Sequence, residues 1–167
     1  LRRRQRQMCI RDRRKPVIMK FSDLKSSILE QFKTTNEVVP FIVGKPGGGK
    51  SSCAREIAQE LAVAHKIPDE RIIEFNPSLR EPCDVLGLPQ FNGDCTKWLP
   101  PEEFWALRQG VGPCVLILEE LSDADMNMQN PLCRVVLDRC AGQLHLSDEL
   151  FIICLLYTSP SPRDISG

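Results

Sequence analysis

The chain has 167 residues, with 22 Lys and Arg against 22 Asp and Glu, and 42% of its residues are hydrophobic. This length suits one globular domain with its own core, and no apolar run approaches the ~20 residues that a membrane-spanning helix needs. Residues 14–153 carry 15 basic and 20 acidic residues, a net charge of −5. That balance argues against general electrostatic binding to DNA or anionic lipid, so we expect no direct nucleic acid partner and no membrane.

The two ends of the chain differ from the rest. Arg3 to Arg13 reads RRQRQMCIRDR, and Cys154 to Asp164 reads CLLYTSPSPRD. Both resemble translations of adapter DNA used to prepare sequencing libraries. The alternatives are a basic nucleic-acid-binding arm and a Pro/Ser linker. We assign residues 1–13 and 154–167 to adapter-derived, non-native sequence and expect residues 14–153 to be a fragment of the natural domain.

A helix and a strand are the first elements that the sequence predicts. Leu24, Ile28 and Phe32 recur at four-residue spacing after Ser22, a residue type that caps helices, and this predicts a helix over 22–33. The apolar run VVPFIV predicts a strand over 38–43.

The segment GKPGGGKS, Gly44 to Ser51, follows this strand and precedes a helix-forming stretch that reaches about His65. Strand, glycine-rich turn and helix are the parts of a phosphate-binding loop, whereas the alternative is an ordinary glycine turn. Glycine lets backbone N–H groups converge on phosphate oxygens, and the helix dipole favours the same anion. We predict a nucleoside triphosphate site in which Lys50 reaches the β- and γ-phosphates and the Ser51 hydroxyl binds Mg²⁺. The candidate nucleotide-binding residues are Gly44, Pro46, Gly47, Gly48, Gly49, Lys50, Ser51 and Ser52.

Further strands and helices alternate along the rest of the chain. RIIEF, at 71–75, predicts a strand. Residues 76–101 are rich in Pro, Gly and Asn and predict mostly loop. PPEEFWALRQG predicts a short helix that ends before Gly110. VLIL, at 115–118, predicts a buried parallel strand. A helix is expected over 126–140, followed by a hairpin of QLHL and ELFII turned at Ser147-Asp148. This order predicts the α/β class, as a three-layer αβα sandwich with a mainly parallel sheet.

Two carboxylates follow the predicted buried strand, in LILEEL at 116–121. In P-loop enzymes such a strand end holds Mg²⁺ through its water shell, and a second acid orients the attacking water. We therefore assign the metal to Ser51 and Glu119 and the catalytic roles to Glu120 and Lys50, because positioned carboxylates, a cation and Mg²⁺ suffice for triphosphate hydrolysis.

The cysteines of the body form no C-x-x-C pair and no zinc-finger spacing with His65 or His145. We expect buried, reduced thiols in a cytoplasmic protein, with a zinc site or a disulfide framework as the alternatives. The six are Cys53, Cys83, Cys95, Cys114, Cys133 and Cys140.

For four other side chains, a structural role is an alternative to a functional one. Asp84 either senses nucleotide or makes a turn, and Trp98 and Trp105 are expected to be core or interface anchors. Arg139 either acts at a subunit boundary or pairs with carbonyls or with Asp138.

GKPGGGKS, DVLGLP, WLPPEEF and LILEELSDADMNMQNPLCRVVLDR together resemble the AAA+ ATPases of the MoxR and dynein-related group, over residues 41–153. The resemblance implies an αβα nucleotide domain with a helical lid, which binds ATP and Mg²⁺ and assembles into a ring, usually a homo-hexamer. Such rings use ATP hydrolysis to remodel partner proteins, often ones with a von Willebrand A domain.

The chain departs from this family in two places. Glu119 stands where the family usually has Asp, and the adapter junction after Ile153 precedes the expected polar strand-end residue, the arginine finger and the lid. We therefore expect an αβα domain that is incomplete at its C-terminus and that binds nucleotide weakly and hydrolyses it slowly. The alternatives are a nucleotide-binding switch with impaired hydrolysis, for which Glu119 is the hint, and another P-loop phosphotransferase.

Overall fold

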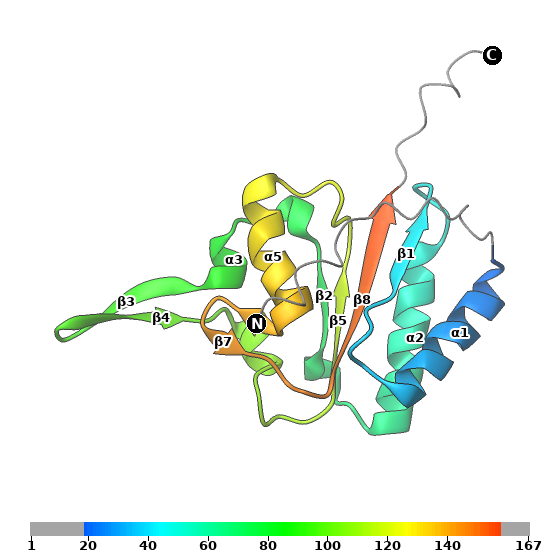
Figure 1. Cartoon of the computed structure of the whole chain (residues 1–167), viewed down its shortest axis with the longest axis horizontal. Coiled ribbons are helices and arrows are strands. Elements are labelled where there is room, and N and C mark those ends of the chain that lie inside the picture. The colour runs from blue at the N-terminus through cyan, green and yellow to red at the C-terminus, as the bar shows by residue number, and fades with distance from the viewer. Residues whose placement is uncertain (1–18, 158–167) are drawn as a thin grey trace, which may run out of the picture.

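A computed structural model of the chain describes residues 19–157, in which helices cover both faces of a parallel sheet (Figure 1). The sheet has the strand order β1-β8-β5-β2, and every neighbouring pair is parallel. The predicted α/β class with a mainly parallel sheet is therefore confirmed. The four strands are β1 (Phe41–Gly44), β2 (Ile72–Phe75), β5 (Cys114–Leu118) and β8 (Leu150–Tyr157).

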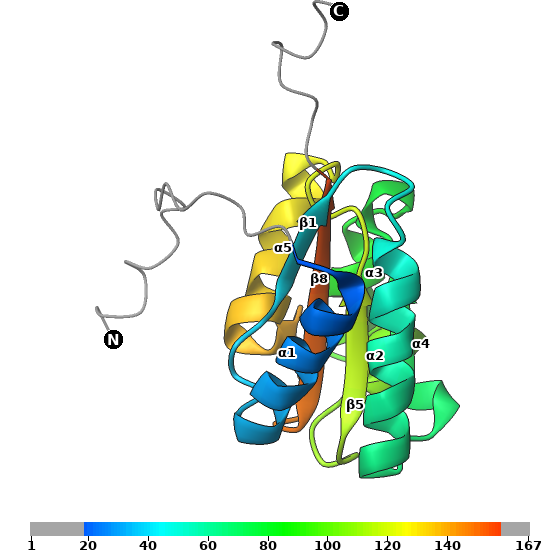
Figure 2. The same ribbon diagram turned by 90° about the vertical axis from the view of Figure 1, so that its right-hand side faces the viewer.

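The sheet lies between two helical layers (Figure 2). Helices α1 and α2 pack on one face, where α2 follows the glycine-rich loop, and α5 packs on the other face. Short helices complete the connections. The helices are α1 (Phe21–Thr34), α2 (Lys50–His65), α3 (Cys83–Leu86), α4 (Glu102–Ala106), α5 (Met126–Asp138) and two 3-10 turns, η2 (Asp69–Arg71) and η3 (Pro77–Leu79).

Side chains of β8 alternate between the two cores. Odd-numbered residues pack against α1 and α2, whereas even-numbered residues pack against α5. Because both faces of the strand are covered, its sequence is continuously apolar rather than alternating. The first set is Phe151, Ile153 and Leu155, and the second is Leu150, Ile152 and Cys154.

Strand β8 continues four residues beyond Ile153, through Cys154–Tyr157, into the segment that the sequence assigns to adapter DNA. Phe41 pairs with Cys154 and Gly44 pairs with Tyr157, so this extension supplies the whole partner of β1. The adapter origin of these four residues stays a prediction. In the structure they form the end of β8, the strand end that we expected to be missing. The other residues assigned to adapters, 1–13 and 158–167, lie outside the described residues.

The expected loop over 76–101 is wrong, because it contains an antiparallel hairpin. Strands β3 (Leu88–Asn92) and β4 (Cys95–Leu99) pair across a two-residue turn, Gly93-Asp94, and project from the body of the domain (Figure 1). Gly93-Asp94 is a two-residue hairpin signal, and Gly93 has the positive φ of 66° that the first position of such a turn needs. The local composition of Pro, Gly and Asn masked this signal.

The expected hairpin at Ser147-Asp148 is also wrong. Strand β7 (Leu144–His145) pairs with β6 (Cys140–Ala141), whereas β8 lies parallel between β1 and β5. The Ser147 hydroxyl donates to the carbonyl of Gly112, 2.6 Å away, instead of forming a turn between paired strands.

Several predicted boundaries shift in the structure. Helix α1 begins at Phe21 with Lys20 as its N-cap, so the predicted capping role of Ser22 is wrong. Strand β1 begins at Phe41 rather than at residue 38, and Pro40 just before it has no N–H to donate to a neighbouring strand. Helix α5 ends at Asp138, because Arg139 has a left-handed φ of 54°.

The cysteines differ in their exposure to solvent. Cys53, Cys114 and Cys140 are buried as expected, but Cys83 and Cys95 are exposed. Among residues 19–157 no cluster of three metal-ligating side chains occurs, and no helix there is long and apolar enough to cross a membrane.

Candidate functional site

The carboxyl ends of the four parallel strands lie along one edge of the sheet. The glycine-rich loop follows β1, Glu119 and Glu120 follow β5, and β8 lies between these two strands. Open α/β sheets bind their ligands at this edge, where loops from neighbouring strands meet. The topology therefore brings the two predicted motifs to one place.

The loop between β1 and α2 has the backbone of an anion cradle. Gly47 and Gly49 have φ of 71° and 78°, a region that residues with a Cβ rarely adopt, and a Cβ on Gly47 would meet nothing within 4 Å. Helix α2 has Gly49 as its N-cap, with no side-chain cap and no acidic residue in its first turn. Its first N–H groups are therefore free of side-chain partners and open to a phosphate.

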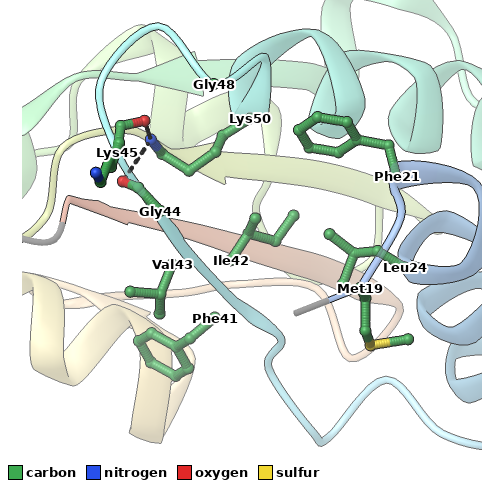
Figure 3. A pocket seen from close by; sticks show the side chains of 10 residues that line it. All are labelled: Met19, Phe21, Leu24, Phe41, Ile42, Val43, Gly44, Lys45, Gly48 and Lys50. Atoms are coloured by element: carbon green, nitrogen blue, oxygen red, sulfur yellow. Dashed lines mark hydrogen bonds between the residues drawn. The ribbon is translucent and has the colours of Figure 1, made fainter. Parts of the chain in front are cut away.

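Lys50 is buried against this loop, with 6% of its surface exposed. Its ammonium Nζ donates to the carbonyl oxygens of Gly44 and Lys45, at 2.8 and 2.7 Å (Figure 3). The same nitrogen lies 4.2 Å from the centre of the Tyr157 ring. Burial lowers the pKa of Lys50, and the charge of Glu120 opposes this shift. The cation is thus held at the loop, next to the place where phosphates would bind.

Glu120 has a positive φ of 51°, which is uncommon for a residue with a side chain. Its carboxylate accepts hydrogen bonds from the Tyr157 hydroxyl at 2.9 Å, the Ser78 hydroxyl at 2.9 Å and the Asn76 side-chain amide at 3.2 Å. These bonds, with that of Tyr157 first, lower the pKa of Glu120. The carboxylate is therefore held by three donors, Tyr157 at the end of β8, Asn76 directly after β2 and Ser78 in the turn η3.

Glu119 faces a different environment. Its side chain is 19% exposed, and its Oε1 lies 3.9 Å from a guanidinium nitrogen of Arg55 on α2. Arg55 also binds Glu74 of β2, with Nε at 2.8 Å and Nη2 at 2.9 Å from the two carboxylate oxygens. The backbone N–H of Glu119 donates to the carbonyl oxygen of Phe75 at 2.9 Å, and this bond holds the end of β5 against β2.

Glu119 and the Ser51 hydroxyl fit Mg²⁺ in donor chemistry, because that ion prefers oxygen ligands. Mg²⁺ commonly takes only one or two protein ligands and completes its shell with water and phosphate oxygens. The described residues offer no three-membered cluster of metal ligands. This donor set suits an ion that arrives with a nucleotide.

Four residues of the site were missed by sequence reasoning: Arg55, Asn76, Ser78 and Tyr157. Asn76 carried a usable signal, since it directly follows a predicted strand at the same sheet edge. Tyr157 carried none, because its segment was excluded from the domain. Arg55 and Ser78 act through contacts with residues far away in the sequence.

Of the four side chains with two predicted roles, Arg139 and Asp84 make structural contacts. Arg139 is buried and donates to the carbonyls of Leu150 and Asn36, and burial lowers its pKa. The carbonyl-pairing alternative is therefore confirmed. The Asp84 carboxylate accepts the Glu81 N–H at 3.0 Å, as a turn-making residue does. Trp98 and Trp105 are 38% and 48% exposed, so neither is a core anchor.

A cavity of about 500 Å³ adjoins the glycine-rich loop (Figure 3). Four loop residues, Gly44, Lys45, Gly48 and Lys50, line one part of it, and six apolar residues line the rest. The apolar lining residues are Met19, Phe21, Leu24, Phe41, Ile42 and Val43. The glycine-rich loop is therefore bordered by a mainly apolar cavity.

Comparison with known proteins supports the fold. No protein-family model and no curated protein matches the chain. Crystal structures of NtrX from Brucella abortus are similar to it. One is 19% identical over 85% of this chain and 31% of NtrX, with a TM-score of 0.51. The ATP complex is 18% identical over 84% and 30%, with a TM-score of 0.53. The ADP complex is 19% identical over 87% and 31%, with a TM-score of 0.52.

The chain thus spans about a third of the length of NtrX. At this identity the likeness concerns the fold alone, an α/β fold with a four-stranded parallel sheet flanked by helices.

Proposed function

We propose that this chain is the nucleotide-binding part of an ATPase that hydrolyses ATP with Mg²⁺ to remodel a partner protein. The observation that carries the proposal is the meeting of the phosphate-loop lysine and the strand-end acid at one sheet edge. Lys50 begins the helix that follows β1, Glu120 follows β5, and β8 is the strand between β1 and β5. Crystal structures of NtrX, which shares this fold, include complexes with ATP and with ADP.

Each residue then has a role in binding or chemistry. The loop over 44–49 and the first N–H groups of α2 would bind the phosphates, and Lys50 would stabilise charge on the β- and γ-phosphates. Ser51 and Glu119 would hold Mg²⁺, which would neutralise charge on the transferred phosphate. Glu120 would orient the attacking water and accept its proton.

The finer assignment rests on sequence motifs. The similarity of GKPGGGKS and LILEEL, with their flanking segments, to the MoxR and dynein-related group supports a ring, usually a homo-hexamer, that acts on a protein partner. A protein with a von Willebrand A domain is the partner class that this resemblance suggests.

Nucleotide binding is tested with the 167-residue chain and a fluorescent ATP analogue, with Mg²⁺ and with EDTA. We expect Lys50→Ala to weaken binding at least tenfold, because it removes a charge-assisted contact worth about 1.5–3 kcal/mol. Lys45→Ala is the matched control: this lysine is an exposed neighbour in the same loop, and its side chain has no partner among the described hydrogen bonds. Equal losses in the two variants would show that general charge, not the site, governs binding.

A nucleotide-binding switch with impaired hydrolysis is the second candidate, and the geometry of Glu120 favours it. Three donors already occupy its carboxylate. Phosphate release measured beside binding separates the two functions. In an ATPase, Glu120→Gln keeps nucleotide binding and loses turnover. In a switch, the unmodified chain binds ATP and releases phosphate no faster than this variant does.

A further inference from the structure

Arg55 lies beside both groups that are proposed to hold Mg²⁺. It stands on α2 four residues after Ser51, so the two side chains share one face of the helix. Nη2 of Arg55 lies 3.9 Å from Oε1 of Glu119, which follows β5. A positive charge is therefore present next to a candidate metal site, where it would repel a second cation.

The register of the sheet brings a second acid to this arginine. Ile117 of β5 is buried in the core under α1 and α2, and Ile72 of β2 packs against the same core. Because side chains alternate along a strand, Glu74, two residues after Ile72, faces α2 as well. Glu74 pairs with Ile117 in the register, so Glu119 lies two residues beyond the neighbour of Glu74. Both acids therefore reach the α2 side of the same sheet edge.

Glu74 holds the guanidinium of Arg55 by two of its nitrogens. Nε donates to both carboxylate oxygens, at 2.8 and 3.0 Å, and Nη2 donates to one of them at 2.9 Å. Such paired N–H groups fix the position of a guanidinium and also offset its charge. At 3.9 Å, the contact between Arg55 and Glu119 is too long for a hydrogen bond.

The carboxylate of Glu119 is left open by this arrangement. Its side chain is 19% exposed, and within residues 19–157 Arg55 is its one ion-pair partner. If Arg55 lost Glu74, the nearest carboxylate for it to bind would be that of Glu119. The guanidinium and Mg²⁺ would then compete for the same oxygens.

We propose that Glu74 is a positioning residue that holds Arg55 off Glu119 and so keeps this carboxylate available to Mg²⁺. Arg55 limits the affinity for the metal, and its pairing with Glu74 weakens that limit. The inference rests on the proposed function, because it concerns the Mg²⁺ that accompanies the nucleotide.

The contribution of the metal to nucleotide binding measures this effect. The dissociation constant of the fluorescent ATP analogue is determined with EDTA and with saturating Mg²⁺. The first constant divided by the second, the metal ratio, reports the coupling between metal and nucleotide. A substitution that only loosens α2 changes both constants alike and leaves the metal ratio unchanged.

Two single substitutions should move the metal ratio in opposite directions. Arg55→Gln removes the competing cation, so we expect the ratio to rise about threefold, the scale of one exposed ion pair. Glu74→Gln releases Arg55 to Glu119, so we expect the ratio to fall about threefold. The side chains of Arg55 and Glu74 are 52% and 39% exposed, so neither substitution should disturb the core.

The double variant separates this role from a general effect of charge. If Glu74 acts through Arg55, Glu74→Gln has no effect in the Arg55→Gln background, and the double variant keeps the threefold rise. If the charge of Glu74 acts on the metal directly, Glu74→Gln lowers the ratio equally in both backgrounds. Glu60→Gln is the matched control and should leave the ratio unchanged, because Glu60 is an exposed acid of α2 that pairs with Lys25 at 2.6 Å.

The outcomes are distinct. Equal effects of Glu74→Gln in the two backgrounds, the same fall in Glu60→Gln, or single variants that match the unmodified chain would each overturn the role of Glu74. Failure of the proposed function would look different. The unmodified chain would then have a metal ratio of one, or would bind the analogue no more tightly than Lys50→Ala does, and this inference would fall with it.

Discussion

Two hairpin turns allow one steric prediction to be made with its own control. Gly142 and Gly93 each occupy the first position of a two-residue turn, with φ of 58° and 66°. A Cβ on Gly142 would lie 2.5 Å from the carbonyl oxygen of Leu86, at the end of α3, whereas a Cβ on Gly93 would meet nothing within 4 Å. Alanine would therefore strain the backbone at both positions, but it would clash with a neighbour only at position 142.

The shared strain is small. A left-handed backbone costs a residue with a Cβ roughly 1–2 kcal/mol, and the loss of glycine freedom in the unfolded chain returns about 0.4–1 kcal/mol. We expect Gly93→Ala to cost about 1 kcal/mol or less, and to act mainly within the projecting hairpin. Gly142→Ala must also move α3 or the β6–β7 turn, which adds about 1–3 kcal/mol, as overpacking does elsewhere.

Urea unfolding followed by circular dichroism measures both variants. We expect Gly142→Ala to lower the free energy of unfolding by about 1–4 kcal/mol and the melting temperature by roughly 3–12 °C, against about 3 °C or less for Gly93→Ala. Equal losses would refute the reasoning, because they would show that backbone strain alone decides the cost and that α3 yields freely to a methyl group.

Two further predictions concern the cysteines. Cys83 and Cys95 are exposed and should react promptly with a thiol reagent in the folded chain. Cys114 and Cys154 are buried and should react only when the chain unfolds. Prompt labelling of either buried thiol would contradict the packing of the sheet. Burial raises the pKa of Cys114 from 9.0 to about 11 and that of Cys154 to about 12. Because the folded chain holds these protons more tightly than the unfolded chain, the free energy of unfolding is unchanged below pH 9 and falls as the pH rises above it, by roughly 1 kcal/mol per thiol at pH 10. Urea titrations at pH 8 and pH 10 measure this loss, and Cys114→Ala should reduce it by about half; an unchanged loss in that variant would assign the effect to other groups.

The sequence alone determined the features that are local in the chain. The phosphate loop is one contiguous pattern between a strand and a helix, and the buried strand before Glu119 is one continuous apolar run. Such signals need no knowledge of distant residues, because backbone conformation and burial on both faces are visible in neighbouring letters. They sufficed for the α/β class and for Lys50, Ser51, Glu119 and Glu120 as candidates, whose roles stay predictions.

Only the tertiary structure decided which strands adjoin and what the acids contact. The placement of β8 between β1 and β5 brings Tyr157 to Glu120 across 37 residues of sequence, and the order β5-β2 brings Asn76 to the same carboxylate across 44. No local pattern encodes these contacts, because they depend on strand order and register, which the whole set of packed side chains selects together. The sequence identified the groups that can do chemistry, and the sheet determined their hydrogen-bond partners.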